Sequence, residues 1–432
     1  MSAATLARGL RPVRAGLDNG VVILAQESGT APAVSINATF FAGSAQDPSD
    51  LPGVAYLARR VIDRGAAHRT AAEIADTLDD RGVSLRVAAA RDSFTVSCDC
   101  LSGDLDVLLA LMADVIREPL FPEAEIDKRR VEAITSVLQD EDNPSVRGID
   151  ALVEMLYGPA HPYGRRFKGT RASLERIERR HLVEFHERHL RPAALRLAIV
   201  GDVPAGAALE SAARVFEGWR RPAAVQGAVQ PPPRRSSRQV RLEAMPGKPQ
   251  SDIGYGFTAI RRLDPRYYAY WMMNNVLGQF GLGGRLADNI RERQGMAYYA
   301  YSTLEARVSE GPLIIRAGVD PANVERTIDA IDAEVGSLGE SGPTASEFAD
   351  TQASLIGSIP RLLETNESIA EFLLGAEQFG LGLDHDRRLP GLLREVTLDA
   401  VREAAAEVLD PARASIVVAG PKSTISHPGR PF

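Results

Sequence analysis

Several features that would point to a specific class of protein are scarce in this sequence. The 432 residues include only two cysteines, and nearly all the positive charge is arginine, so lysine is rare. The formal net charge of −7 argues against a nucleic-acid-binding surface. No run approaches the roughly 18 apolar residues that a membrane-spanning helix needs, and residues 1–24 lack the pattern of a signal peptide. We therefore expect a soluble, cytoplasmic protein that binds neither nucleic acid nor membrane.

The two cysteines, Cys98 and Cys100, lie in a segment that alternates as a β-strand does. Residues i and i+2 of a strand point to the same face, and a disulfide between them would strain the backbone. We expect reduced, structural thiols, with metal binding or redox chemistry as the less favoured interpretation.

The main change in composition lies close to the midpoint of the chain. The segment Pro222–Arg238 contains three consecutive prolines flanked by Gly, Gln and Ser, which predicts a semi-extended linker. A chain of this length is also too long for one ordinary core. We expect an N-terminal domain over 1–221, the linker over 222–238 and a C-terminal domain over 239–432.

The two halves share the same order of expected elements. In the first half we expect strands at 21–25, 34–41, 83–89, 94–100 and 195–200, and helices at 54–64, 105–112 and 123–140. In the second half we expect strands at 238–242, 253–257, 297–304 and 311–318, and helices at 267–277, 324–335 and 345–359. Because helices and strands are segregated, the pattern predicts an α+β fold. It would consist of two homologous α/β-sandwich domains, each an antiparallel-rich sheet with helices packed on one face.

The helix expected after Pro52-Gly53 resembles the zinc-binding helix of the pitrilysin/insulinase peptidases, which include mitochondrial-processing-peptidase-like proteins. Their pattern is His-x-x-Glu-His, in which two histidines on one helix face bind zinc and the glutamate polarises a water. Here the corresponding positions hold Tyr56, Arg59 and Arg60. A guanidinium has no lone pair to donate to a cation and stays protonated, so this face would repel zinc.

The third zinc ligand of the family is a glutamate on the order of 75 residues downstream. That spacing leads to Thr135 or Ser136, and the accompanying glutamate falls near Lys128 or Arg129. The resemblance therefore implies that this chain binds no metal. Arg59 and Arg60 then form either a solvated helix face, with Arg59 paired to Asp63, or a surface that faces the active-site cavity of a partner.

A segment of the C-terminal half resembles a second motif of this family. A glycine-rich turn at Gly281, Gly283 and Gly284 is followed by Arg-Leu, an Arg-Glu pair and Gly-x-Ala-Tyr. The resemblance implies that Arg291 and Tyr298 hold the substrate backbone and stabilise the oxyanion at a zinc site made elsewhere. The turn lacks Gly-Lys-Ser/Thr and is not a nucleotide-binding loop.

The order His186-Glu187-Arg188-His189 superficially suggests a metal site. The two histidines are three residues apart, close to the expected end of a helix. We favour structural, helix-terminal histidines over metal ligands.

Two functions from different classes remain. The first is the non-zinc subunit of a heterodimeric peptidase, with zinc and His-x-x-Glu-His supplied by a homologous partner and a peptide as substrate. The second is a non-catalytic structural or peptide-binding protein, similar to the core subunits of respiratory complexes. The Arg291/Tyr298 pair favours the first, because a scaffold has no use for it.

Overall fold

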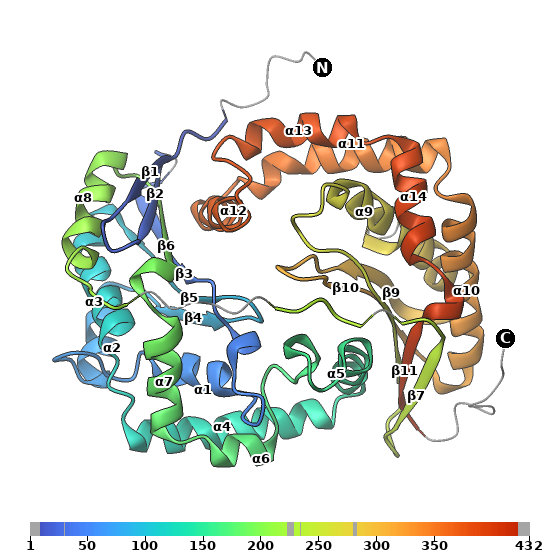
Figure 1. Cartoon of the computed structure of the whole chain (residues 1–432), viewed down its shortest axis with the longest axis horizontal. Coiled ribbons are helices and arrows are strands. Elements are labelled where there is room, and N and C mark those ends of the chain that lie inside the picture. The colour runs from blue at the N-terminus through green and yellow to red at the C-terminus, as the bar shows by residue number, and fades with distance from the viewer. Residues whose placement is uncertain (1–8, 30, 223–228, 234, 280–282, 422–432) are drawn as a thin grey trace. The chain divides into compact units, whose positions relative to one another are not determined.

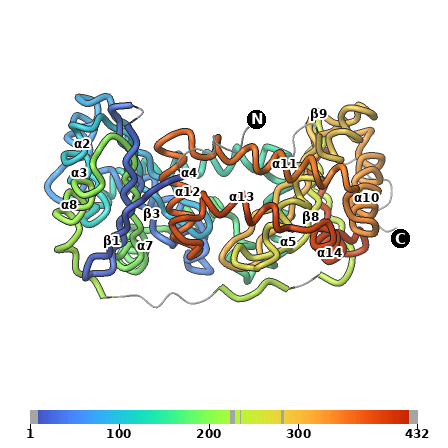
Figure 2. The backbone as a smooth tube through the Cα atoms, turned by 90° about the horizontal axis from the view of Figure 1, so that it is seen from above, coloured from blue at the N-terminus to red at the C-terminus, as the bar shows by residue number. Residues whose placement is uncertain are grey.

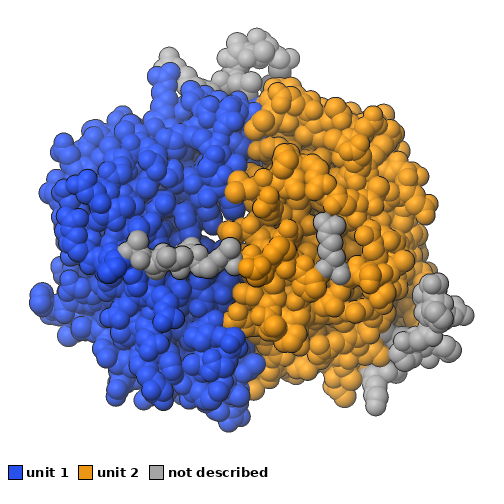
Figure 3. Space-filling model, in the orientation of Figure 1, with its two compact units in different colours: residues 1–135, 167–227, 358–390 blue, residues 136–166, 228–357, 391–432 orange. Residues whose placement is uncertain are grey.

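The computed structural model describes residues 9–29, 31–222, 229–233, 235–279 and 283–421 (Figure 1). The chain forms two compact units, which Figure 3 shows in different colours. Unit 1 comprises Met1–Thr135, Phe167–Gly227 and Ser358–Pro390, and unit 2 comprises Ser136–Arg166, Ala228–Gly357 and Gly391–Phe432. Each unit therefore contains segments from both halves of the sequence. The described residues of the expected linker contain neither helix nor strand.

Unit 1 is built around a six-stranded mixed sheet. The strand order is β1-β2-β6-β3-β5-β4, with β2 and β6 parallel and the other neighbours antiparallel. The strands are β1 (Val13–Gly16), β2 (Val22–Glu27), β3 (Ala33–Phe40), β4 (Arg86–Ala89), β5 (Phe94–Leu101) and β6 (Leu195–Gly201). This confirms the antiparallel-rich α+β prediction, although β1 was not expected.

Helices cover both faces of this sheet, and both Figure 1 and Figure 2 show this arrangement. On one face lie α3 (Leu105–Arg117) and α8 (Ala205–Phe216), and on the other lies α12 (Asn366–Gln378). The central strands β2 and β6 are consequently almost wholly buried. The prediction of helices on one face only was incomplete, because α12 comes from the other half of the chain.

Unit 2 contains a five-stranded sheet in the order β7-β11-β8-β10-β9, with β7 and β11 parallel. Its strands are β7 (Gln239–Ala244), β8 (Ser251–Thr258), β9 (Ala297–Leu304), β10 (Pro312–Val319) and β11 (Ser415–Gly420). The helix α5 (Pro144–Tyr157), from the N-terminal half, packs on β8 and β11. It approaches closely because β8 has glycines at 254 and 256, where a Cβ would lie 3.3 and 3.1 Å from Leu152 Cδ2.

The remaining helices complete the two units. They are α1 (Val54–Val61), α2 (Ala71–Asp79), α4 (Glu123–Glu141), α6 (Arg171–Arg176), α7 (Arg179–His189), α9 (Tyr267–Asn274), α10 (Val324–Ser341), α11 (Ala345–Leu362), α13 (His385–Glu395) and α14 (Leu398–Val408). Several begin at side-chain caps, such as the capping box of Thr70 and Glu73 ahead of α2. Within the described part of the chain, no helix is both long enough and apolar enough to cross a membrane.

Candidate functional site

The helix α1 in unit 1 carries the positions where the family motif has zinc ligands. It begins after Gly53, whose φ of +105° is open mainly to glycine. The buried Asp47 carboxylate accepts hydrogen bonds from the backbone N–H of Gly53 and Ala55, at 2.7 and 2.8 Å. This carboxylate satisfies free N–H groups in the first turn and sets the direction of the helix.

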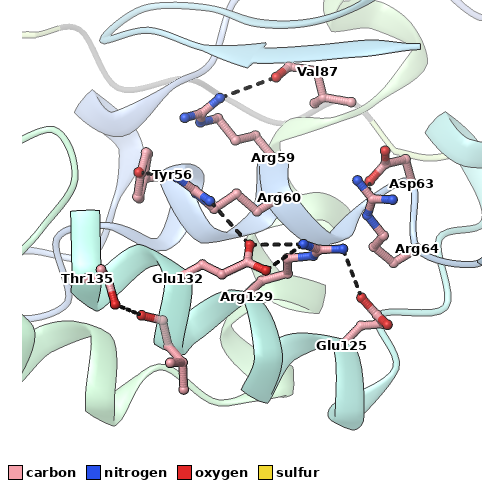
Figure 4. A network of polar contacts seen from close by, with 11 residues as sticks. Tyr56, Arg59, Arg60, Asp63, Arg64, Val87, Glu125, Arg129, Glu132 and Thr135 are labelled. Carbon is pink, nitrogen blue, oxygen red and sulfur yellow. Dashed lines mark hydrogen bonds and ion pairs between the residues drawn. The ribbon is translucent and has the colours of Figure 1, made fainter. Parts of the chain in front are cut away.

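Tyr56 is buried at the centre of a group of cations, at the position of the first zinc-binding histidine. Its hydroxyl accepts a hydrogen bond from Arg60 Nη2 at 2.7 Å (Figure 4). The guanidinium carbons of Arg59 and Arg60 lie 4.7 and 4.8 Å from the ring centroid, and Lys168 Nζ lies 5.9 Å away. The aromatic face is therefore used to hold fixed positive charges, at a place where the family motif binds a metal cation.

Carboxylates on α4 balance part of this charge. Glu132 lies 3.7 Å from Arg60 Nη1 and accepts hydrogen bonds from Arg129 at 2.8 and 2.9 Å. Arg129 also pairs with Glu125 at 3.5 Å, so the network runs along one face of α4 (Figure 4). The hydrogen bond from Arg129 lowers the pKa of Glu132, which remains ionised.

The expected ion pair between Arg59 and Asp63 does not form. Asp63 pairs instead with Arg64 Nε at 3.2 Å, while Arg59 Nη1 points to the Val87 carbonyl of β4 at 3.5 Å. Burial raises the pKa of Asp63. The Arg59 side chain lies against the edge strand β4 and the Tyr56 ring. It is half-buried, so the prediction that it belongs to a solvated helix face was wrong.

The downstream positions provide no metal ligand either. Thr135 is exposed and donates to the Val131 carbonyl at 2.9 Å, and Ser136 is half-buried. The carboxylate that does face α1 is Glu132, one turn before Ser136, and it is occupied by guanidiniums. Among the described residues no group of three His, Cys, Asp or Glu side chains could hold a metal ion. The side chains present do not fit zinc.

The second motif lies in unit 2, beyond the glycine-rich turn. Gly281 is outside the described residues, Gly283 is exposed, and Gly284 is buried against Gly278, where a Cβ would come within 2.8 Å of the Gly278 Cα. Arg285 then forms a two-point ion pair with Glu347 of α11, Nε to Oε1 at 2.6 Å and Nη2 to Oε2 at 2.8 Å. This pair ties the turn to the helical layer.

Arg291 lies on a π-helical segment, Ala287–Arg293, and Tyr298 lies on the edge strand β9. The Arg291 side chain is about half exposed and contacts Glu292 at 3.5 Å. Tyr298 is 82% exposed and lines a cavity of about 420 Å³ that also includes Gln250, Met296 and Asp320. Both side chains can thus present a hydrogen-bond donor outward, and no described contact joins them.

A β-bulge explains the unusual exposure of Tyr298. Along the β9–β10 ladder Gly318 is opposite Tyr299 and Val319 is opposite Ala297, so Tyr298 has no partner residue. A bulge of this kind turns one side chain away from the alternation of the strand. The bulge is therefore the feature that aims Tyr298 at solvent.

The neighbouring Tyr299 secures this bulge. Its hydroxyl donates to the buried Asp252 carboxylate of β8, which also accepts from Gln250 Nε2 at 3.3 Å. Burial, with the hydrogen bond to Asp252, raises the pKa of Tyr299 to about 12, and burial raises the pKa of Asp252. The Tyr299 ring lies over Gly318, where a Cβ would be 2.6 Å from Cε1. Sequence reasoning missed these residues; the only signal was the adjacent Tyr298-Tyr299 pair, which breaks the alternation of a strand.

His186 and the two cysteines of unit 1 have structural surroundings. His186 is buried and its Nε2 lies 2.7 Å from the Ile116 carbonyl, and burial lowers its pKa to about 4. Cys98 and Cys100 are unpaired and buried, which raises their pKa values to about 12 and about 11. Neither thiol is a ready nucleophile at neutral pH.

Comparisons with known proteins find matches on both halves of the chain. Residues 22–161 match the insulinase family (peptidase family M16), and residues 176–355 match the peptidase M16 inactive domain. An uncharacterized zinc protease from Mycobacterium leprae is 26% identical over 427 residues, covering 96% of this chain and 93% of that protein.

Two solved structures are similar along nearly the whole chain. The crystal structure of a peptidase M16 inactive domain from Pseudomonas fluorescens has a TM-score of 0.90 at 26% identity, over 96% of this chain and 99% of that one. A protease from Helicobacter pylori has a TM-score of 0.88 at 16% identity, over 96% and 100%, and indicates the shared fold. With matches on both halves and the same architecture, this chain belongs to the insulinase family, peptidase family M16.

Proposed function

We propose that this chain is the non-zinc subunit of a cytoplasmic, heterodimeric insulinase-family metallopeptidase that hydrolyses peptides. In this proposal the chain is inactive alone, and a homologous partner subunit binds the zinc ion. Arg291 and Tyr298 complete the partner's site by holding the substrate backbone and donating to the oxyanion.

The exposed Tyr298 on its bulge is the observation that carries this proposal. Tyr298 is 82% exposed on its bulge, and the buried Tyr299–Asp252 hydrogen bond holds the neighbouring backbone, so the phenol is presented outward, where a substrate bound to the partner could reach it. A phenol and a guanidinium are suited to a developing negative charge in a site shielded from water. The charge network around Tyr56 supports the other half of the proposal, because it leaves no place for zinc in this chain.

The first experiment measures zinc content and peptidase activity of the purified chain, alone and mixed with a homologous subunit. The partner would be the product of a neighbouring gene that carries intact His-x-x-Glu-His, and the probes would be internally quenched peptides. We expect a zinc-free, inert chain and activity on mixing. A partner whose motif glutamate is replaced by Gln serves as control, since its mixture must stay inactive.

A non-catalytic structural or peptide-binding protein is the second candidate. It is favoured by the similarity to a solved M16 inactive domain. If mixing gives neither a complex nor activity, this candidate replaces the first and Arg291 and Tyr298 lose their assigned roles.

A further inference from the structure

A cavity of about 240 Å³ lies in unit 1, where α7 ends and β6 begins. It is separate from the α1 cluster and from the Tyr298 motif. Its lining includes three arginines and a histidine (Arg188, His189, Arg191 and Arg196) beside Phe41, and no lining residue is acidic. We call it the arginine pocket.

Backbone carbonyl groups hold two of the guanidiniums in place. Arg191 Nε donates to the Arg188 carbonyl at 2.8 Å, and its Nη1 donates to the Pro222 carbonyl. Arg196 Nη1 donates to the carbonyls of Ala193 and Leu195, each at 3.0 Å. Carbonyl acceptors orient these cations but do not neutralise them.

The pocket has little negative charge to balance its arginines. Arg196 Nε lies 3.7 Å from Glu377 Oε1, but Arg14 Nη2 contacts the same oxygen at 2.8 Å. Neither Arg188 nor Arg191 has a described carboxylate within ion-pair distance. His189 Nδ1 is buried without a hydrogen-bond partner among the described residues. Burial, together with Arg188 and Arg191, lowers the pKa of His189 to about 4.

We propose that the arginine pocket binds a phosphate-type oxyanion, either free or as the terminal phosphates of a small molecule. The planar guanidinium matches phosphate geometry with two parallel hydrogen bonds, which a lysine cannot do. A volume of 240 Å³ is several times the ~30 Å³ share of one water, so phosphate or pyrophosphate fits. This site is independent of the proposed peptidase role.

A simpler explanation accounts for part of the arrangement. Cations near the C-terminus of a helix stabilise its last carbonyls, and α7 ends at His189. That explains Arg188, which lies in the last turn of α7, and Arg191, which bonds to the Arg188 carbonyl, but it does not explain Arg196 on β6. A measurement of anion binding distinguishes the two explanations, because arginines that serve only to stabilise the helix end would not bind phosphate in a saturable way.

Calorimetric titration of the full chain with pyrophosphate and with inorganic phosphate, at constant ionic strength set by NaCl, tests the proposal. We expect saturable 1:1 binding that is about tenfold weaker in Arg188→Gln, whose exposed side chain makes no described contact that folding needs. Arg180→Gln is the matched control, because Arg180 lies on the same helix outside the pocket and pairs with Glu178 at 3.1 Å. Its affinity should equal that of the unmodified chain.

A second variant, Arg191→Gln, covers the case in which the exposed Arg188 side chain contributes little to anion affinity. Arg191→Gln removes an oriented guanidinium, and a thermal melt without ligand shows whether it is folded. Binding to pyrophosphate but not to inorganic phosphate would indicate a di- or triphosphate ligand. Binding to both anions would indicate that the site recognises a single phosphate group. Either result supports the proposed site. Equal weakening in Arg180→Gln, or no binding at about 10 mM, would leave the arginines as helix-end caps and overturn the proposal.

Discussion

Each position of the degenerate zinc motif shows how one substitution changes what its neighbours can do. Tyr56 provides a ring and a hydroxyl in place of an imidazole, and Arg59 and Arg60 gather around it. Once these cations are present, a carboxylate such as Glu132 forms ion pairs with them and no longer has a metal to coordinate. Reverting a single residue to histidine would therefore not restore a zinc site.

Tyr298 and Arg291 provide the most direct prediction at this scale. In the mixed complex, Tyr298→Phe should lower kcat by roughly 100-fold or more while assembly is unchanged, because one oxyanion donor is lost. Steady-state kinetics with a quenched peptide and size-exclusion chromatography measure the two quantities. Tyr301→Phe, on the same strand, controls for loss of a phenol elsewhere. Full activity in Tyr298→Phe combined with Arg291→Ala would rule out the assigned role.

The Arg285–Glu347 pair predicts a pH-dependent contribution to stability. The hydrogen bond from Arg285 lowers the pKa of Glu347 from its ordinary 4.5 to about 2. A lowered pKa contributes stability that is complete above the ordinary value and is lost as pH falls through the folded value. Glu347→Gln should lose roughly 2 kcal/mol at neutral pH. The deficit should shrink between pH values of about 4.5 and about 2.

Urea unfolding over a pH series measures this deficit. Glu340→Gln is the control, because Glu340 is exposed on α10 and makes no described ion pair. It should change stability by less than about 0.5 kcal/mol at every pH. A deficit in Glu347→Gln that stays constant down to acid pH would contradict an electrostatic origin.

At the scale of elements, the β9 bulge is the feature that turns a strand residue into a candidate functional residue. Regular pairing would give Tyr298 a partner on β10 and the alternation of an ordinary strand. The bulge leaves Tyr298 without a partner on β10, while Tyr299 still packs over Gly318. The sequence alone reveals the strand but not the bulge, because the register depends on contacts with β8 and β10.

Gly318→Ala should disturb this bulge. A Cβ at Gly318 would lie 2.5 Å from Gln250 Nε2 and 2.6 Å from Tyr299 Cε1, so the Tyr299 ring must move. We expect a loss of about 1–3 kcal/mol in unfolding free energy and a lower activity in the mixed complex. Gly16→Ala is the matched strand control, since nothing lies within 4 Å of its Cβ position. Equal stability of both variants would show that the bulge tolerates a side chain.

At the scale of the whole molecule, the two halves exchange helices. The strands β2 and β6 bury Val22, Leu24, Ala198 and Val200 against α12, which contributes Ile369, Ala370, Leu373 and Leu374. In unit 2, α5 from the first half covers β8 and β11. Neither half of the sequence can complete its own core, so the boundary near 222–238 separates the sheets but not the compact units.

This exchange predicts how fragments behave. Residues 1–221 expressed alone lack α12, so the apolar face of the sheet should be exposed, bind a hydrophobic dye and promote aggregation. Co-expression with 239–432 should restore a soluble complex, and Leu373→Asp in the second fragment should prevent it, because Leu373 is fully buried. Glu371→Gln, on the exposed side of the same helix, is the control. A cooperative unfolding transition of 1–221 alone would contradict the exchange.

The sequence by itself determined the α+β class, carried the resemblance to the family, and placed Tyr56, Arg59 and Arg60 where that family has zinc ligands. The class follows from local periodicity, which is a property of neighbours along the chain, and the motif positions follow from the resemblance of short segments to the family. The tertiary structure alone decided that Arg59 turns from Asp63 to Val87, that Tyr298 leaves the strand at a bulge, and that α5 and α12 pack on the other half's sheet. All three features are contacts between segments that are far apart in the sequence. Burial and charge pairing between such segments depend on the packing of the folded chain, which local sequence does not specify.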